Sequence, residues 1–241
     1  MGLATLIPQN GTAAVEVGNV DGVKVAGLLL QAGPVNSDAL LMWGQEGYAG
    51  NSANPGAMSD VYARVGGTNA TGDMRATNMV QINSGNTIVD NTWLWRADHD
   101  VQGLVSNSRN PVDTGLLING DNVTGYGLAC EHTLKDMLKW NGNNGKAYFY
   151  QSEFPYDVTQ ENYGDKNYSA FVVNDKVTNF EGYGLGAYSF FRDNVVEVES
   201  GFRAPSVPGV TLTNSLDVFL NGKGGIKHIV DEQGSSVQSG T

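Results

Sequence analysis

Two glutamates in the middle of the chain, Glu131 and Glu153, have the residue type and the spacing for acid–base chemistry. They lie in the segments CEH and SEFPYD, 22 positions apart. Two carboxyl groups that are held close together cannot both ionise freely, so the pKa of one should rise, as a general acid at neutral pH requires. The pair therefore predicts general acid catalysis, provided that the fold brings the two side chains together.

Aromatic and polar residues that suit a neutral sugar surround this pair between Asn91 and Asp157. Trp rings can stack on sugar faces, and polar side chains can bond to hydroxyl groups. Trp93 and Trp95 alternate in one predicted strand, and we expect at least one of them in the core. Acidic residues at turns also cap backbone N–H groups, which is the structural alternative. The predicted substrate-binding residues are Trp95, Arg96, Asp98, His99, Trp140, Asn141, Gln151, Tyr156 and Asp157.

Other chemical signatures are missing from the sequence. The single cysteine, Cys130, has only His132 nearby and so lacks a zinc ligand set; we interpret it as a buried small hydrophobe. The glycine-rich segment at Gly182–Gly186 has neither the lysine nor the following helix of a phosphate loop. No GxSxG or HExxH motif occurs. We therefore predict no metal site and no cofactor.

Short strands must position the glutamates, because strand–turn–strand units recur along the chain. Each unit has an alternating apolar strand, an Asn/Gly/Asp turn and a second β-branched strand. The units are Val15–Ala26, Val80–Thr92, Leu117–Gly127 and Val172–Gly182. This repetition predicts an all-β fold, a single-stranded right-handed parallel β-helix of the pectin-lyase-like type, over residues 1–234. A β-sandwich is the alternative.

The coil length of such a solenoid decides whether the glutamates meet. A coil of about 22 residues would give about nine to eleven coils and would stack Glu131 and Glu153 roughly 4.8 Å apart along the axis. Segments without strand character are predicted to be loops that shape a binding face: 44–55, 66–75, 100–111 and 155–168. The polar stretch 235–241 is predicted to be a loosely held tail.

Charge and hydropathy narrow the choice of partner. The net charge of −11 would repel a phosphate backbone, so we predict no nucleic acid partner. The apolar runs fall far short of the roughly 20 residues of a membrane span, so no membrane partner is predicted. The start GLATLIP lacks the features of a signal peptide, and we expect the chain to begin inside a fold. Four N-x-S/T sequons favour secretion; they lie at Asn10, Asn69, Asn122 and Asn167.

Several long motifs carry a resemblance to a known family. They are WLWRADHD, DTGLLINGDNVTGYGLACEH, KWNGNNGKAYFYQSEFPYD and YGLGAYSFF followed by VTLTNSLDVFLNGKGGIKHIV. Over nearly its whole length the chain resembles the C-terminal β-helix of large secreted bacterial and fungal proteins, often labelled coagulation factor 5/8 type domain proteins, which are similar to glycoside hydrolase family 55. The resemblance implies a secreted, extracellular β-1,3-glucanase-like protein.

The resemblance also implies roles for the two glutamates. Family 55 enzymes have two tandem β-helices with the active cleft between them, and they act by inversion. The general acid comes from the C-terminal helix and corresponds to Glu153; a second glutamate that helps to hold the water corresponds to Glu131. Inversion needs roughly 6.5–9.5 Å between carboxyl groups. We therefore expect the two side chains to splay apart.

Three functions remain open at this stage. The first is a glycoside hydrolase that acts on a β-glucan. The alternative is a non-catalytic glycan-binding or assembly solenoid that lacks the N-terminal half of the active site. A polysaccharide lyase ranks third, because the central stretch offers mainly Arg96 to neutralise an acidic polymer unless calcium is bound. The expected partner is a polysaccharide or oligosaccharide. Exposed strand edges near Leu3–Ile7 also predict self-association or an N-terminal β-helix partner.

Overall fold

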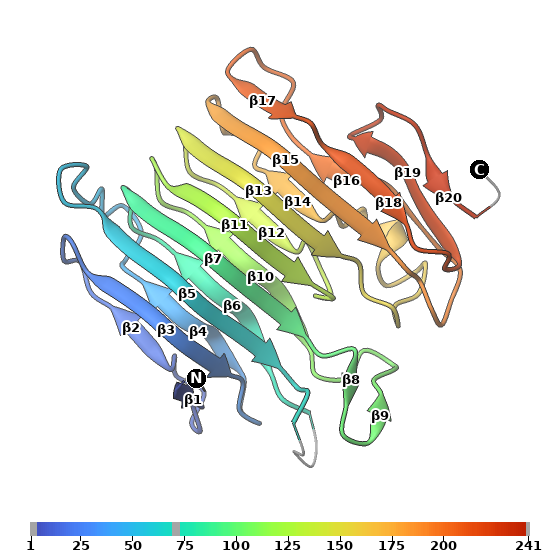
Figure 1. Cartoon of the computed structure of the whole chain (residues 1–241), viewed down its shortest axis with the longest axis horizontal. Coiled ribbons are helices and arrows are strands. Elements are labelled where there is room, and N and C mark those ends of the chain that lie inside the picture. Colours follow the sequence, from blue (N-terminus) through green and yellow to red (C-terminus); the bar gives the residue numbers. More distant parts are fainter. Residues whose placement is uncertain (1–3, 69–72, 240–241) are drawn as a thin grey trace.

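The protein is a parallel β-helix. The computed structural model describes residues 4–68 and 73–239. In this part of the chain two nine-stranded sheets run along the molecule, and the chain passes from one sheet to the other and back in each coil. Figure 1 shows the coils following one another from β1 at one end to β20 at the other. The fold predicted from the strand–turn repeats is confirmed.

The strands of the two sheets alternate along the chain. Sheet A contains β1 (Ala4–Leu6), β3 (Lys24–Gln31), β5 (Gly56–Val65), β7 (Thr87–Arg96), β11 (Thr124–Glu131), β13 (Gly145–Glu153), β15 (Phe180–Ser189), β17 (Val210–Thr213) and β18 (Leu216–Phe219). Sheet B contains β2 (Val15–Val17), β4 (Ser37–Trp43), β6 (Ala76–Ile82), β10 (Val112–Ile118), β12 (Leu138–Trp140), β14 (Phe171–Val173), β16 (Val196–Arg203), β19 (Gly224–Val230) and β20 (Val237–Gln238).

Coil length varies, and the predicted 22 residues hold for one region only. Leu128 pairs with Tyr150, which lies 22 positions later, whereas Thr92 pairs with Leu128, 36 positions later. The prediction of a uniform coil is therefore wrong, and sheet A has fewer levels than the nine to eleven coils expected. The loops that leave the coils absorb the additional residues. The coil from β11 to β13 has few additional residues in its loops, so its paired residues lie 22 positions apart.

A left-handed residue interrupts the alternation of sheet A strands. In β7 it is Asn91, with φ 52°. Val89 before it and Leu94 after it both point into the core, although they are an odd number of positions apart. One additional residue in a strand shifts its alternation by one. Trp93 and Trp95 consequently both face outward, and the expectation that one of them is in the core is wrong. Equivalent left-handed positions are Gly27, Asp60, Gly127, Phe149 and Gly184.

The space between the sheets is filled by apolar side chains. Cys130 is fully buried there, as predicted, and burial raises the pKa of its thiol. Trp140 is also fully buried and packs against Phe171 and Phe180. Large side chains that stack on their counterparts in the next coil make this core continuous.

Long loops gather where sheet A strands end. The segment 66–75, of which residues 69–72 lie outside the described residues, follows β5. The segments 100–111 and 155–168 follow β7 and β13, whereas 44–55 follows β4 and lies at the other turn of the coil. Loop 100–111 carries the hairpin of β8 (His99–Asp100) and β9 (Gly103–Leu104), and loop 155–168 carries the short 3-10 helix η1 (Gly164–Lys166). Within the tail 235–241, β20 pairs with β19 in antiparallel fashion. Among the described residues no helix is long and apolar enough to cross a membrane.

Candidate active site

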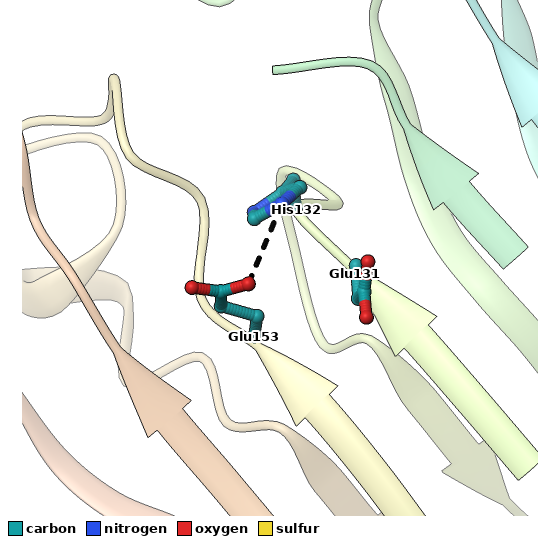
Figure 2. A group of neighbouring side chains, drawn as sticks. All are labelled: Glu131, His132 and Glu153. Atoms are coloured by element: carbon teal, nitrogen blue, oxygen red, sulfur yellow. Dashed lines mark ion pairs between the residues drawn. The ribbon is translucent and has the colours of Figure 1, made fainter. Parts of the chain in front are cut away.

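The ends of three neighbouring sheet A strands bring the predicted glutamates together. Glu131 ends β11 and Glu153 ends β13, and the two residues are direct partners in the parallel register. On its other side Glu131 is the register partner of Trp95 in β7. The predicted stacking of the two carboxylates on neighbouring coils is thus confirmed, and Figure 2 shows both side chains at their strand ends.

Glu131 is a buried carboxylate with a hydrogen-bond donor on each oxygen. The indole Nε1–H of Trp93 donates to Oε2 at 2.8 Å, and the amide Nε2–H of Gln151 donates to Oε1 at 3.1 Å. Burial raises the pKa of Glu131, the Trp93 hydrogen bond opposes this, and the charge of Glu153 adds to the rise. Two N–H donors match a group that only accepts, so these two hydrogen bonds stabilise the ionised carboxylate and oppose the effect of burial.

Glu153 has a different set of neighbours. The Tyr156 hydroxyl donates to its Oε1 at 2.6 Å, and its Oε2 faces the His132 ring, with 4.0 Å between Oε2 and Nε2. Burial raises the pKa of Glu153, the Tyr156 hydrogen bond opposes this, and Asp98 adds to the rise. With one oxygen occupied by a donor and the other free, the carboxyl group has a place for a proton on Oε2.

His132, which was not among the predicted site residues, stands directly beside Glu153. It follows β11 with φ 63°, and its side chain is 3% exposed. Nδ1 lies 3.1 Å from the carbonyl oxygen of Phe154. Because a carbonyl only accepts, Nδ1 carries the hydrogen of the neutral ring. Burial lowers the pKa of His132 to about 4, so at neutral pH Nε2 directs a lone pair towards Glu153 and Asp98.

Arg96 and Asp157 form a buried ion pair behind the site. Their side chains are 1% and 2% exposed. The two terminal nitrogens of the guanidinium each donate one hydrogen bond to the carboxylate, from Nη1 at 2.9 Å and from Nη2 at 2.8 Å. Arg96 also donates to the carbonyl oxygens of Arg109 and His132, and the backbone N–H of Ser108 donates to Asp157. The prediction that this pair binds sugar hydroxyls is wrong, because its bonding groups are already used. The pair ties loops 100–111 and 155–168 to β7.

Contacts from the segment after β15 hold Tyr156 against Glu153. The backbone carbonyl of Tyr156 accepts hydrogen bonds from the N–H groups of Arg192 and Asp193, and the Arg192 guanidinium lies 5.8 Å from the tyrosine ring centroid. The Arg192 side chain also donates to the Val105 carbonyl in the neighbouring loop. The backbone and ring of Tyr156 are thus held by Arg192 and Asp193, and Arg192 is itself bonded to loop 100–111, so the direction of the Tyr156 hydroxyl is fixed.

An aromatic surface adjoins the carboxylates on the outer face of sheet A. Trp93 is 48% exposed, and its ring centroid lies 5.9 Å from that of Trp95. Both rings line a cavity of about 310 Å³ together with Leu29, Tyr62, Ala63 and Arg64. Asp98 lies near His132, and its Oδ1 is 3.0 Å from Nδ1 of the exposed His99. Trp95, Asp98, His99, Gln151 and Tyr156 therefore lie at the site, and their binding of a substrate stays a prediction.

Two predicted sugar-binding residues lie elsewhere. Trp140 is in the core, so it cannot stack on a sugar, and its prediction is wrong. Asn141 precedes β13, whereas Glu153 ends that strand. Its amide donates to the Asn119 side chain of the previous coil at 2.8 Å, so Asn141 belongs to a structural ladder and not to the site.

Three donor atoms from two coils come close together at the site. One oxygen of Glu131, one oxygen of Glu153 and one ring nitrogen of His132 lie within 4.8 Å of one another. The expected splaying of the two carboxyl groups stays a prediction. The sequence offered a weak signal for His132, since it directly follows Glu131 in the segment CEH, and none for the outward direction of Trp93.

A parallel β-helix with stacked carboxylates beside outward-facing tryptophans defines a pectate-lyase-like solenoid with an acidic site. A family model for the LAM55 pectate lyase-like domain matches residues 1–153. The chain belongs to this family.

Known relatives are consistent with this assignment. The chain is 45% identical over 247 residues to an exo-beta-1,3-glucanase of Streptomyces sp. (strain SirexAA-E / ActE), covering all of this chain and 40% of the relative. The solved structure of sacteLam55A from Streptomyces sp. SirexAA-E matches with a TM-score of 0.93 and 43% identity, over 99% of this chain and 44% of that one. A sacteLam55A variant in complex with glucose matches with a TM-score of 0.92 and 44% identity, over 98% of this chain and 43% of that one. The chain thus spans less than half the length of these relatives. They support the family 55 part of the resemblance, and none of the three bears the coagulation factor 5/8 label.

Proposed function

We propose that this chain is the part of a β-glucan-cleaving glycoside hydrolase that carries the general acid, with a β-1,3-glucan as substrate. The observation that supports this most is the unequal hydrogen bonding of two stacked carboxyl groups. Glu131 accepts two N–H donors, whereas Glu153 keeps Oε2 free for a proton. Environments that push two carboxyl groups towards different protonation states assign an acid and a charged partner.

In this proposal Glu153 protonates the glycosidic oxygen as the bond to the leaving sugar breaks. Glu131 stays ionised, stabilises the positive charge that develops on the cleaved sugar and helps to hold the water. One oxygen of Glu131 and one of Glu153 lie within 4.8 Å of each other, and inverting enzymes hold the two carboxyl groups roughly 6.5–9.5 Å apart so that a water fits between them. Inversion therefore needs further polar groups around the water, and the resemblance implies that an N-terminal β-helix supplies them.

The sugar ring next to the cleaved bond is proposed to lie on the aromatic surface. Trp95 is the register partner of Glu131, and Trp93 binds that glutamate directly, so a sugar that contacts these rings lies within reach of the acid. Stacking on indole suits a neutral sugar. This chemistry, like that of the relatives, favours an extracellular polysaccharide as the partner.

The test is hydrolysis of laminarin by this chain, alone and joined to an N-terminal β-helix of the family. Glu153→Gln should lower the rate by about 10²–10⁴-fold, because a general acid contributes that much. The matched control Glu46→Gln, at an exposed position in loop 44–55, should leave the rate unchanged. Proton NMR of the first product gives the anomer, and we expect inversion. Full activity in Glu153→Gln would remove this residue from the mechanism.

The aromatic cavity also supports a second function, glycan binding without cleavage. Trp93 and Trp95 form it whether or not the water site is complete. If the chain cleaves nothing, laminari-oligosaccharides should still bind, and Trp95→Ala should weaken that binding while Glu153→Gln does not. The self-association or partner at the first coil stays a prediction. Within the described residues β1 pairs with β3 only, and the residues of β1 are exposed.

A further inference from the structure

The cluster of Glu131, His132 and Glu153 has the donor types of a transition-metal site. One imidazole nitrogen and carboxylate oxygens from two residues are ligands that zinc accepts, with metal–ligand distances of about 2.0–2.2 Å. Tetrahedral geometry at these distances places donors about 3.4 Å apart. The distance from His132 Nε2 to Glu153 Oε2 is 4.0 Å. Small side-chain rotations would therefore close the three donors around one ion. Figure 2 shows the His132 ring directed towards Glu153.

The surroundings of the three side chains match those of metal ligands. A ligating histidine almost always donates its second ring N–H to a carbonyl or carboxylate, and ligating carboxylates are themselves hydrogen-bonded. His132 donates from Nδ1 to the Phe154 carbonyl, which leaves Nε2 as the free donor atom. This side chain is 3% exposed, and within the described residues no hydrogen bond to Nε2 is formed.

The carboxylates are oriented in the same way. Glu131 is held by Trp93 and Gln151, and Glu153 is held through Oε1 by Tyr156, so that its Oε2 is free towards His132. Asp98 lies outside this group of three, with its Oδ1 4.0 Å from His132 Nε2.

The charge balance also favours a cation. Asp98, Glu131 and Glu153 contribute three carboxyl groups around the His132 ring. The nearby Arg96 is already paired with Asp157, and it bonds to the backbone carbonyl of His132 without reaching the ring. Cys130 is buried in the core and cannot compete for the metal.

We propose that Glu131, His132 and Glu153 bind one divalent transition-metal ion of the zinc class. Mixed imidazole and carboxylate ligands favour zinc or copper over calcium and magnesium, which prefer oxygen ligands alone. The proposal departs from the sequence-based expectation of no metal. One consequence rests on the proposed function: a proton and a metal ion would compete for Glu153 Oε2, so the bound ion would inhibit hydrolysis.

The test is titration calorimetry of the untagged chain with zinc chloride in a non-chelating buffer, without a glucan. We expect one saturable equivalent that EDTA removes. Glu153→Gln and Glu131→Gln should each weaken zinc binding by at least about 10-fold, since losing even an outer-shell partner costs 10–100-fold. The matched control is Glu199→Gln, in a surface pair where Glu199 Oε1 lies 3.6 Å from His228 Nε2. It should leave the affinity unchanged.

A second measurement guards against variants that fail to fold. Cobalt added to the parent chain should give the visible absorption of a four-coordinate ion, and zinc should abolish it. The proposal is overturned if no saturable site exists, or if Glu153→Gln binds zinc as the Glu199→Gln control does. Because no glucan is present, these results are independent of whether the chain hydrolyses one.

Discussion

The two turns of each coil use similar polar residues for different purposes. At the turn that leads from sheet B into sheet A, Asn119 donates to Asn83, and Asn141 donates to Asn119, each at 2.8 Å. At the turn that leads from sheet A into sheet B, the successive coils present Asp98, His132 and Tyr156. Identical residues in successive coils satisfy one another and form a ladder. Different residues in successive coils leave donors and acceptors that converge on the two glutamates.

Close backbone packing enforces the regularity of the asparagine turn. A Cβ at Gly142 would come within 1.9 Å of the Gly120 carbonyl oxygen, and one at Gly120 within 2.1 Å of the Ser84 carbonyl oxygen. Successive coils can approach this closely only where glycine is present. The site turn instead carries long loops, which leave room for a ligand.

The greatest loss of stability is expected for a tryptophan in the core, Trp140 of β12, in contrast to Trp93 on the outer face of β7. Trp140→Ala should lower the free energy of unfolding by about 3–5 kcal/mol, because it empties a core position. Trp93→Ala should cost less, about 1–3 kcal/mol, because this side chain is half-exposed and the main loss is its hydrogen bond to the buried Glu131. It should also weaken binding of laminari-oligosaccharides. Urea unfolding and calorimetry measure the two quantities. Equal stability losses would contradict the assignment of Trp140 to the core and Trp93 to the surface.

An intermediate effect tests the asparagine ladder. Asn119→Ala removes both the donor to Asn83 and the acceptor of Asn141, so unfolding should become easier by about 1–3 kcal/mol. Glycan affinity should not change, because the ladder lies at the other turn. The control is Asn51→Ala in the exposed loop 44–55. A loss of glycan affinity in Asn119→Ala with unchanged stability would overturn the structural role of this turn.

A pH-dependent effect concerns a buried carboxyl group without donors. Asp217 in β18 has both oxygens buried with no hydrogen-bond partner among the described residues, and burial raises its pKa to about 8. The unfolded pKa is about 3.9, so between about pH 4 and 8 the native state holds a proton that the unfolded chain releases. Stability contributed by this group is lost as the pH rises through that window.

Asp217→Asn should remove this pH dependence. The variant should gain more stability relative to the parent at pH 9 than at pH 5, as measured by urea unfolding at both values. Parallel stability curves for the two chains would contradict the raised pKa. The pKa of Asp217 is raised, as are those of Glu131 and Glu153. Asp217 differs from these two site residues because it has neither hydrogen-bond donors nor an aromatic cavity beside it.

Patterns in the sequence were enough to predict the class of fold and the principal pair of residues. Strand and turn propensities are local, so repeated apolar strands with Asn/Gly turns were enough to predict a β-helix. The 22-residue spacing of Glu131 and Glu153 happened to span a short coil, and so their stacking could be predicted. Gln151 and Tyr156 followed because they are close to Glu153 along the chain.

Tertiary structure alone decided the directions and partners of the remaining side chains. The left-handed Asn91 shifts the alternation of β7, which turns both tryptophans outward, and no local pattern marks that shift. Trp140 could be assigned to the core only once Phe171 and Phe180 were seen on neighbouring strands. Coil lengths range from 22 to 36 residues. These lengths decide that His132 lies beside Glu153 and that Arg96 forms an ion pair with Asp157. Contacts between coils are set by the register of whole strands and by loop length, and neither is encoded in a short stretch of sequence.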